Sequence, residues 1–211
     1  MRSKERLLWD CRLYLILDTQ VYPYETLFDI AKRAIPMGVD IVQLRDKSGS
    51  AKDILRFSKD IIRLTKNKIP YIINDRVDLA IASKASGVHL GQDDIPIALA
   101  RKMMGEGAII GASCQTWAHA KKAVNEGADY LGFGSVFKTL TKPDRNPMDL
   151  DLLSKVFRHI KIPVFAIGGI RIKDMPILEG LGVTRVAVCR GIGQAKNIQK
   201  SVRAFKNFLR G

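Results

Sequence analysis

The chain has 211 residues, with 35 Lys and Arg against 21 Asp and Glu, a formal net charge of +14 and 46% hydrophobic residues. This length and apolar content suit one domain with a sizeable core and exclude a largely disordered protein. No apolar run approaches the roughly 20 residues that a membrane-spanning helix needs. Residues 1–12 are charged and do not resemble a signal peptide. We therefore expect a cytoplasmic protein without membrane partners.

The distribution of charge and the cysteine content narrow the possible classes of protein further. Lys and Arg are scattered through helical stretches such as 60–68 and 196–210, without a basic run that is interleaved with aromatics. This pattern favours a solvated basic surface over a nucleic-acid partner. Three widely spaced cysteines without a Cys-x-x-Cys pair argue against a disulfide framework or a zinc site and fit a reducing compartment: Cys11, Cys114 and Cys189.

Short apolar runs alternate with longer amphipathic segments along the whole chain. Eight strands are predicted, at residues 13–17, 41–44, 71–73, 87–90, 109–112, 130–133, 164–167 and 186–189. Helical periodicity lies between them, most clearly at residues 26–37, 51–66, 117–126, 150–159 and 197–209. Eight successive βα units predict a single-domain (β/α)₈ TIM barrel over residues 1–211, with short loops. Glycines between helix and strand suit helix C-caps, at Gly38, Gly87, Gly127 and Gly182.

Function in such a barrel is expected at the carboxyl ends of the strands. The second strand continues into Gln43, Arg45 and Lys47, which share one face because side chains alternate along a strand. Two cations and an amide are thereby directed into the mouth of the barrel. The alternative is a polar strand end that only caps the barrel.

The third and fourth strands end in carboxylates. Asp75 and Asp94 follow neighbouring strands and could approach one Mg²⁺ ion, which carboxylates and substrate phosphates commonly hold. Taken alone, Asn74-Asp75 and Asp93-Asp94 are more often turn residues. His89, between two apolar residues, is interpreted as a hydrogen-bonded barrel residue rather than a metal ligand.

The fifth strand leads into Ser113, Cys114 and Thr116. Ser113 could donate a hydrogen bond to a phosphate oxygen, or Ser113 and Thr116 could cap the next helix. The segment does not decide between these roles. No neighbouring base supports Cys114 as a nucleophile, so we interpret it as inert.

The last three strands are followed by residues suited to phosphate. The loop at 135–148 is long for a compact domain, which is typical of function. It offers two hydroxyls, at Thr139 and Thr141, and two ammoniums, at Lys138 and Lys142. Strands seven and eight end in Gly168-Gly169 and Cys189-Arg190-Gly191. Glycines here expose backbone N–H groups to a phosphate, or form tight turns only.

These residues form one glycine-built phosphate site and a separate cationic cluster around two carboxylates. The cluster comprises Arg45, Lys47, Asn74, Ser113 and Lys142 beside Asp75 and Asp94. It suits the departure of a diphosphate, because cations and Mg²⁺ neutralise the charge that grows on its oxygens.

The order of these motifs resembles the thiamine-phosphate synthase family over nearly the whole chain. The matching segments are Gln43–Lys47, Asn74-Asp75, His89–Asp94, Gly111–Ser113, Thr139–Lys142 and Ile167–Ile170. The resemblance implies transfer of hydroxymethylpyrimidine from its diphosphate to hydroxyethylthiazole phosphate by a dissociative, carbocationic mechanism. It also implies small-molecule substrates and a Mg²⁺ cofactor, with assembly into a homo-oligomer left open.

The resemblance further implies residue roles. Arg45, Lys47, Asn74, Ser113 and Lys142 would hold the diphosphate, Asp75 and Asp94 the Mg²⁺, and Gln43 the pyrimidine. The thiazole phosphate would lie against Thr139, Thr141, Gly168, Gly169 and the backbone of Cys189 to Ile192.

Two positions depart from the family pattern. Lys138 stands where proline is usual, and Arg190-Gly191 stands in place of Ser-Ala. Lys138 affects the loop that follows the sixth strand. Arg190-Gly191 affects the thiazole-phosphate site, where an arginine can itself bind phosphate. A related thiazole tautomerase is the alternative within the fold, but the full diphosphate cluster argues against it. A basic nucleic-acid binder is favoured by the net charge alone.

Overall fold

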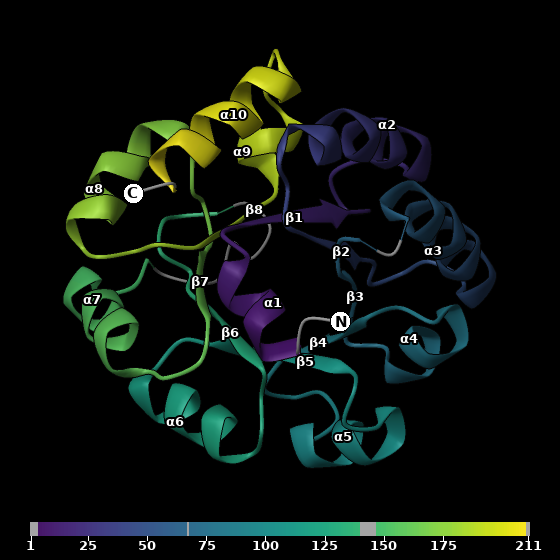
Figure 1. The fold of residues 1–211 in the computed structure, drawn as a ribbon, viewed down its shortest axis with the longest axis horizontal. Coiled ribbons are helices and arrows are strands. Elements are labelled where there is room, and N and C mark those ends of the chain that lie inside the picture. Colours follow the sequence, from purple (N-terminus) through teal and green to yellow (C-terminus); the bar gives the residue numbers. More distant parts are fainter. Residues whose placement is uncertain (1–3, 67, 140–146, 210–211) are drawn as a thin grey trace.

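Eight parallel strands pair with their neighbours in chain order and close into a barrel, which confirms the predicted fold class (Figure 1). The computed structural model describes residues 4–66, 68–139 and 147–209. Closure occurs where Leu13 of the first strand pairs with Val186 of the last. The strands are β1 (Leu13–Asp18), β2 (Ile41–Arg45), β3 (Tyr71–Asn74), β4 (Gly87–Leu90), β5 (Ile109–Cys114), β6 (Tyr130–Phe133), β7 (Val164–Ile167) and β8 (Val186–Val188).

A ring of helices surrounds the strands (Figure 1). Their periodic segments predicted the longer helices to within a few residues, while α4, α5 and α8 are too short to give a clear period. The helices of the ring are α2 (Tyr24–Ala34), α3 (Ala51–Thr65), α4 (Val77–Ser83), α5 (Ile97–Met104), α6 (Trp117–Asn125), α7 (Leu150–His159), α8 (Met175–Gly180), α9 (Arg190–Gly193) and α10 (Ile198–Phe208). Two 3₁₀ turns add to them, η1 (Ile35–Met37) and η2 (Ile172–Asp174).

The charged N-terminal segment forms a further helix, α1 (Lys4–Asp10), which lies across the barrel in Figure 1. Leu8, only 1% exposed, packs against apolar residues inside the barrel at the amino ends of its strands. Lys4 forms an ion pair of 2.9 Å with Asp129, and the guanidinium of Arg185 lies 4.9 Å from the ring of Trp9. The helix therefore closes the end of the barrel that is opposite the expected site.

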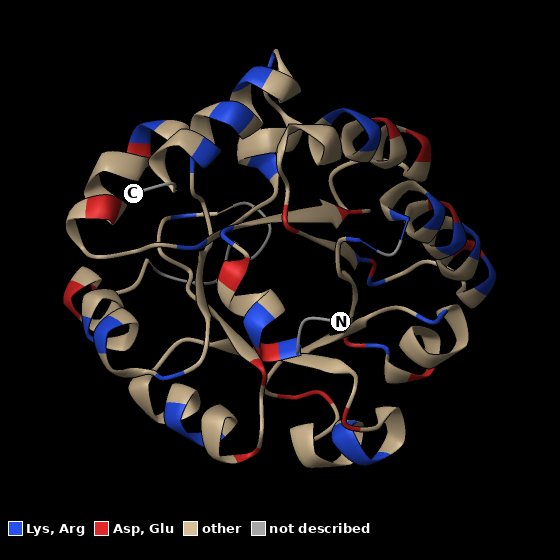
Figure 2. Ribbon diagram, in the orientation of Figure 1, with Lys and Arg blue, Asp and Glu red and all other residues tan. Residues whose placement is uncertain are grey.

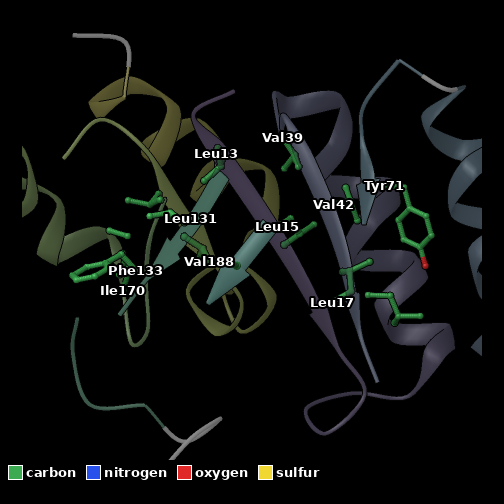
Figure 3. Close-up of a cluster of buried hydrophobic side chains, with 14 of the residues drawn as sticks. Leu13, Leu15, Leu17, Val39, Val42, Tyr71, Leu131, Phe133, Ile170 and Val188 are labelled. Atoms are coloured by element: carbon green, nitrogen blue, oxygen red, sulfur yellow. The ribbon is translucent and has the colours of Figure 1, made fainter. Parts of the chain in front are cut away.

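Two apolar layers stabilise the barrel. The outer layer lies between strands and helices and includes Leu13, Leu15 and Leu17, which alternate along β1 with inward residues (Figure 3). The inner layer fills the barrel with Tyr14, Ile16, Ile41, Ile72, Ile109, Tyr130, Phe165 and Ala187. Each buried residue of this size contributes about 1.5–3 kcal/mol by leaving water. A filled interior confines ligands to the mouth of the barrel.

The predicted helix-capping role of glycine is correct at three positions and wrong at one. Gly38, Gly127 and Gly182 adopt φ values of 109°, 87° and 79°, which other residues rarely adopt. Gly87 instead begins β4, where an added Cβ would lie 1.8 Å from the carbonyl oxygen of Ile109. Helix α4 ends one turn earlier, at Lys84, which itself takes the left-handed conformation. Gly87 is thus required for close strand packing.

The positive charge is spread around the outside of the molecule. Figure 2 shows Lys and Arg on most of the outer helices rather than gathered on one side. Several of them pair with carboxylates one helical turn away, for example Arg33 with Asp29 and Lys122 with Glu126. This distribution is typical of a solvated helix surface. Among the helices of the described residues, none is long and apolar enough to cross a membrane.

Candidate active site

Three adjoining cavities open at the carboxyl ends of the strands. The central cavity, of about 90 Å³, is lined by Gln43, Arg45, Asn74, His89, Ser113, Thr139 and Gly168, among others. A second cavity of about 190 Å³ shares Arg45, Asn74 and Ser113 with it. A third, of about 440 Å³, shares Thr139. The mouth is therefore one continuous site with a pocket on either side of its centre.

The second cavity contains the predicted pair of carboxylates. Lys47 forms an ion pair with Asp75, and Asp94 accepts a hydrogen bond of 2.6 Å from the N–H of Gly91. Burial raises the pKa of Asp75, and the adjacent Asp94 adds to this effect. The pKa of Asp94 is lowered despite its partial burial, because Asp75 and the Gly91 N–H hydrogen-bond to it. The structure thus brings together all three side chains as the sequence predicted.

The backbone of Asp75 takes an unusual conformation. Its φ of 63° lies in the left-handed region, which is uncommon for residues other than glycine. The N–H of Asp75 donates to the carbonyl oxygen of His89 on the neighbouring strand, at 2.9 Å. Such strain persists where surrounding contacts impose it, and it clusters at functional sites. Here it accompanies the placement of a carboxylate in the second cavity.

The two carboxylates suit a divalent cation. Two carboxylates that share one site repel each other when both are ionised, and an added cation removes that repulsion. Among the described residues, no group of three or more His, Cys, Asp or Glu side chains could hold a metal. A cation between Asp75 and Asp94 would therefore need oxygens from water or from a substrate, as Mg²⁺ commonly does.

Arg45 is held by residues that the sequence analysis missed. Its Nη1 lies 3.0 and 3.2 Å from the carboxylate oxygens of Asp18 and 2.6 Å from Oε1 of Gln20. Asp18 is fully buried, and Arg45 is 9% exposed. The available signal is that Asp18 ends a strand that is otherwise apolar. Because a buried charge needs a partner, Asp18 at that place predicts a cation on a neighbouring strand.

The structure decides the alternatives left open on β4 and β5. Thr116 alone caps α6, accepting from the N–H of His119 at 3.1 Å. Ser113 instead faces the central and second cavities, with its hydroxyl 2.9 Å from Nε2 of His89. Nδ1 of His89 lies 3.0 Å from the Tyr130 hydroxyl, so the interpretation as a hydrogen-bonded barrel residue is confirmed. Ser113 is therefore free of the capping role.

Cys114 lies away from the three cavities. It is 1% exposed and packs in the outer apolar layer, between strands and helices. Burial raises its thiol pKa to about 12, so the thiolate is a minor form at neutral pH. This environment agrees with its interpretation as an inert residue.

Two glycines that follow β7 shape the central and third cavities, which Gly168 and Gly169 line respectively. Gly168 and Gly169 have φ values of 104° and 67°. A Cβ on Gly168 would lie 2.2 Å from Oγ of Ser135, and one on Gly169 would lie 2.5 Å from the carbonyl oxygen of Lys138. Gly168 and Gly169 therefore form the predicted tight turns, which bring the loop after β6 close to these cavities. Their binding of a phosphate stays a prediction.

Arginines line the third cavity beside Gly191. Arg190 and Gly191 begin α9, whose first N–H groups have no partner within the helix. Within the part of the chain that the structure describes, Nε of Arg190 is buried and has no hydrogen-bond partner. Arg171, which the sequence analysis did not select, adds a second guanidinium. The predicted phosphate site thus has more positive charge than its glycines alone provide.

Cys189 lies outside the lining of the three cavities. It caps α9 through its backbone and lines a separate small cavity, which shares Arg190 with the third cavity. Burial raises the pKa of its thiol to about 12. Thr141 and Lys142 lie outside the described residues.

The closed barrel and the two charged pockets at its mouth define a (β/α)₈ enzyme that acts on phosphorylated small molecules. A family model described as thiamine monophosphate synthase matches residues 13–192. A thiamine-phosphate synthase of Fusobacterium nucleatum is 39% identical over 94% of this chain and 98% of its own length. A thiamine-phosphate synthase of Clostridium tetani is 38% identical over 95% of this chain and 96% of its own length. The chain belongs to the thiamine-phosphate synthase family.

Solved structures agree with this assignment. The thiamine phosphate pyrophosphorylase from Pyrococcus furiosus superposes with a TM-score of 0.87 and 32% identity, covering 97% of this chain and 98% of that one. A 3-hexulose-6-phosphate synthase, at 15% identity and a TM-score of 0.68, shares the fold alone. The family is a transferase family, which supports the predicted enzyme class over the tautomerase and nucleic-acid alternatives.

Proposed function

We propose that this chain transfers the hydroxymethylpyrimidine group from its diphosphate to the ring nitrogen of hydroxyethylthiazole phosphate, giving thiamine phosphate and diphosphate. The observation that carries the proposal is the arrangement of cavities. Two pockets suited to anions flank a smaller central cavity and share lining residues with it. Such a site can hold two phosphorylated substrates with their reacting ends together.

The second cavity would hold the diphosphate. Arg45, Lys47, Asn74 and Ser113 line it, and Lys142 would join them from the loop after β6. Asp75 and Asp94 would hold Mg²⁺, which supplies positive charge to the leaving oxygens when it is bound. Charged donors that are already oriented stabilise the departing diphosphate without further reorganisation.

The central cavity would hold the pyrimidine, with Gln43 in contact with its ring. The bond between the methylene carbon and the diphosphate oxygen breaks first, and the electron pair leaves with the diphosphate. The thiazole nitrogen then donates its lone pair to the carbocation. No enzyme nucleophile is required, which agrees with the burial of Cys114.

The third cavity would hold the thiazole phosphate. Thr139, Gly168, Gly169 and Gly191 would donate hydrogen bonds to it, together with Thr141 of the same loop. Arg190 and Arg171 add charge. The backbone of Cys189 supports this end of the site by capping α9. We further propose a cytoplasmic location, because all three cysteines are free thiols, as in a reducing compartment.

The test is the release of diphosphate. We expect Mg²⁺-dependent release only when both substrates are present, with thiamine phosphate formed in equal amount. Conversion of the thiazole substrate alone, without diphosphate release, would instead indicate the tautomerase activity. Absence of both reactions would overturn the proposal.

Removing the thiol of Cys114 is expected to leave turnover within about twofold of the wild type, because the mechanism needs no thiolate. Cys114→Ser places a hydroxyl in an apolar layer at a cost of about 1–3 kcal/mol, so Cys114→Ala provides a second variant. Steady-state turnover of both variants is the measurement. A covalent pyrimidine adduct on Cys114, detected by mass spectrometry, would contradict the prediction.

Arg190→Ala is expected to raise the KM for the thiazole phosphate by about tenfold to a hundredfold. This is the loss of affinity that removal of one charge-assisted hydrogen bond typically causes. The KM for the pyrimidine diphosphate should stay nearly unchanged, because its anion lies in the opposite cavity. Kinetics with each substrate varied in turn provide the measurement, with the exposed Arg203→Ala as a control. Equal effects on both substrates, or on neither, would remove Arg190 from the site.

A further inference from the structure

A chain of four hydrogen bonds crosses the interior of the barrel beneath the central cavity. Nε2 of Gln43 donates to the Tyr14 hydroxyl at 2.8 Å, and this hydroxyl lies 2.8 Å from that of Tyr130. The Tyr130 hydroxyl lies 3.0 Å from Nδ1 of His89, whose Nε2 lies 2.9 Å from Oγ of Ser113. The five residues come from five different strands and are joined at every step.

The first donor fixes the direction of every later bond. Because Tyr14 accepts from Gln43, it uses its own proton toward Tyr130, which in turn donates to Nδ1 of His89. A neutral imidazole with an accepting Nδ1 carries its proton on Nε2, so His89 donates to Oγ of Ser113. The hydroxyl proton of Ser113 is then left for a ligand. At the other end, the amide of Gln43 offers its oxygen.

We propose that Tyr14, Tyr130 and His89 are positioning residues that couple the two contacts with the pyrimidine diphosphate. In one polarity of the chain, Gln43 presents an acceptor to an amino group on the pyrimidine while Ser113 presents a donor to the diphosphate. This inference rests on the function proposed above and extends it to substrate selection.

The opposite polarity serves neither end of the substrate. If the amide of Gln43 were reversed, each proton would shift to the other partner, and Ser113 would donate to His89. Ser113 would then offer only lone pairs to an anion, while Gln43 would offer N–H groups to an amino group. A diphosphate that requires a donor at Ser113 therefore favours an acceptor at Gln43, about three strands away.

Burial isolates this chain of hydrogen bonds from the protons of the solvent. Tyr130 is completely buried and Tyr14 is 2% exposed, so water has little access to the middle of the chain. Burial also raises the pKa of both phenols, which keeps each hydroxyl proton in place at neutral pH. A buried hydroxyl without a partner is costly, so a single reversed bond would force the remaining bonds to reverse with it.

The first test is the tautomer of His89 in the wild-type protein without substrate. Nitrogen-15 NMR on histidine-labelled protein should show the proton on Nε2 and a non-protonated Nδ1. The chain has three histidines, and His89→Gln assigns the signal by its loss. A proton on Nδ1 in the folded wild type would overturn the proposal. The tautomer measurement is independent of catalysis. Absence of diphosphate release would therefore refute the proposed function without changing the result of the NMR measurement.

The second test interrupts the chain of hydrogen bonds. Tyr130→Phe should leave His89 as a mixture of tautomers and raise the KM for the pyrimidine diphosphate by about two- to tenfold, with the KM for the thiazole phosphate unchanged. Tyr14→Phe, which frees the amide of Gln43, should raise the same KM and is the second variant. Tyr71→Phe is the matched control, because its buried hydroxyl bonds to Ser58 at 3.0 Å in the outer layer.

The outcomes separate positioning from packing. If Tyr71→Phe changes the KM as much as Tyr130→Phe does, the effect arises from lost stability and the coupling is refuted. An unchanged His89 tautomer together with an unchanged KM in both Tyr14→Phe and Tyr130→Phe also refutes it. A change restricted to the two inner tyrosines supports it.

Discussion

Replacement of Asp75 or Asp94 by Asn is expected to lower turnover by at least about a hundredfold, because each removes a proposed ligand of Mg²⁺. Folding should be affected little, with the free energy of unfolding changed by about 1 kcal/mol or less. Asn tolerates the left-handed backbone of Asp75. At position 94, its side-chain oxygen can still accept from the N–H of Gly91.

The measurement compares turnover as a function of Mg²⁺ concentration with unfolding in urea. Asp78→Asn is the control, since this carboxylate is exposed, lies near Asp75 in the chain and pairs with Arg76. Wild-type turnover and an unchanged Mg²⁺ requirement in both site variants would show that the carboxylates do not hold the metal. Equal losses in the control would indicate a general effect of charge.

Arg45→Ala is expected to damage both binding and folding. Its loss leaves the fully buried Asp18 without its cation, which costs about 3–5 kcal/mol of the free energy of unfolding. It also removes a charged contact with the diphosphate, so the KM for the pyrimidine diphosphate should rise by about tenfold or more. Lys47→Ala is the matched variant, because the Lys47 side chain is 43% exposed and its removal should affect the KM with little loss of stability.

Urea unfolding of three proteins checks the origin of the lost stability: Arg45→Ala, Lys47→Ala and a double variant with Arg45→Met and Asp18→Asn. The double variant should recover most of the stability, because it leaves no unpaired buried charge. If Arg45→Ala unfolds as easily as Lys47→Ala, or if the double variant recovers nothing, the pair with Asp18 is not the source of the effect.

The arrangement of the strand ends was predictable because it depends on local periodicity. Alternation along β2 places Gln43, Arg45 and Lys47 on the inner face, and the structure finds all three at the mouth. The parallel order of βα units brings the carboxyl ends of β3 and β4 together, so Asp75 and Asp94 meet. The positive φ values of Gly168 and Gly169 were also predictable, because glycine adopts such values without steric cost.

Other features depend on contacts between strands that are distant in sequence. Asp18 at the end of an apolar strand indicates a cation on a neighbouring strand, but no local pattern shows that this cation is Arg45. Nor does a local pattern show that Tyr14 reaches Tyr130 across the barrel. The capping role predicted for Gly87 was wrong because its small size serves the carbonyl oxygen of Ile109 on the next strand.

The sequence by itself therefore determined the (β/α)₈ class, the end of the barrel that carries the site and most of the residues that line it, because hydrophobic period and strand alternation are short-range properties. The tertiary structure decided the contacts that these short-range patterns do not reveal. It selected Thr116 over Ser113 as the helix cap, joined Ser113 through His89 and two tyrosines to Gln43, and placed a buried carboxylate behind Arg45. Barrel closure sets these contacts, since it brings into hydrogen-bonding distance side chains that the chain separates by many residues.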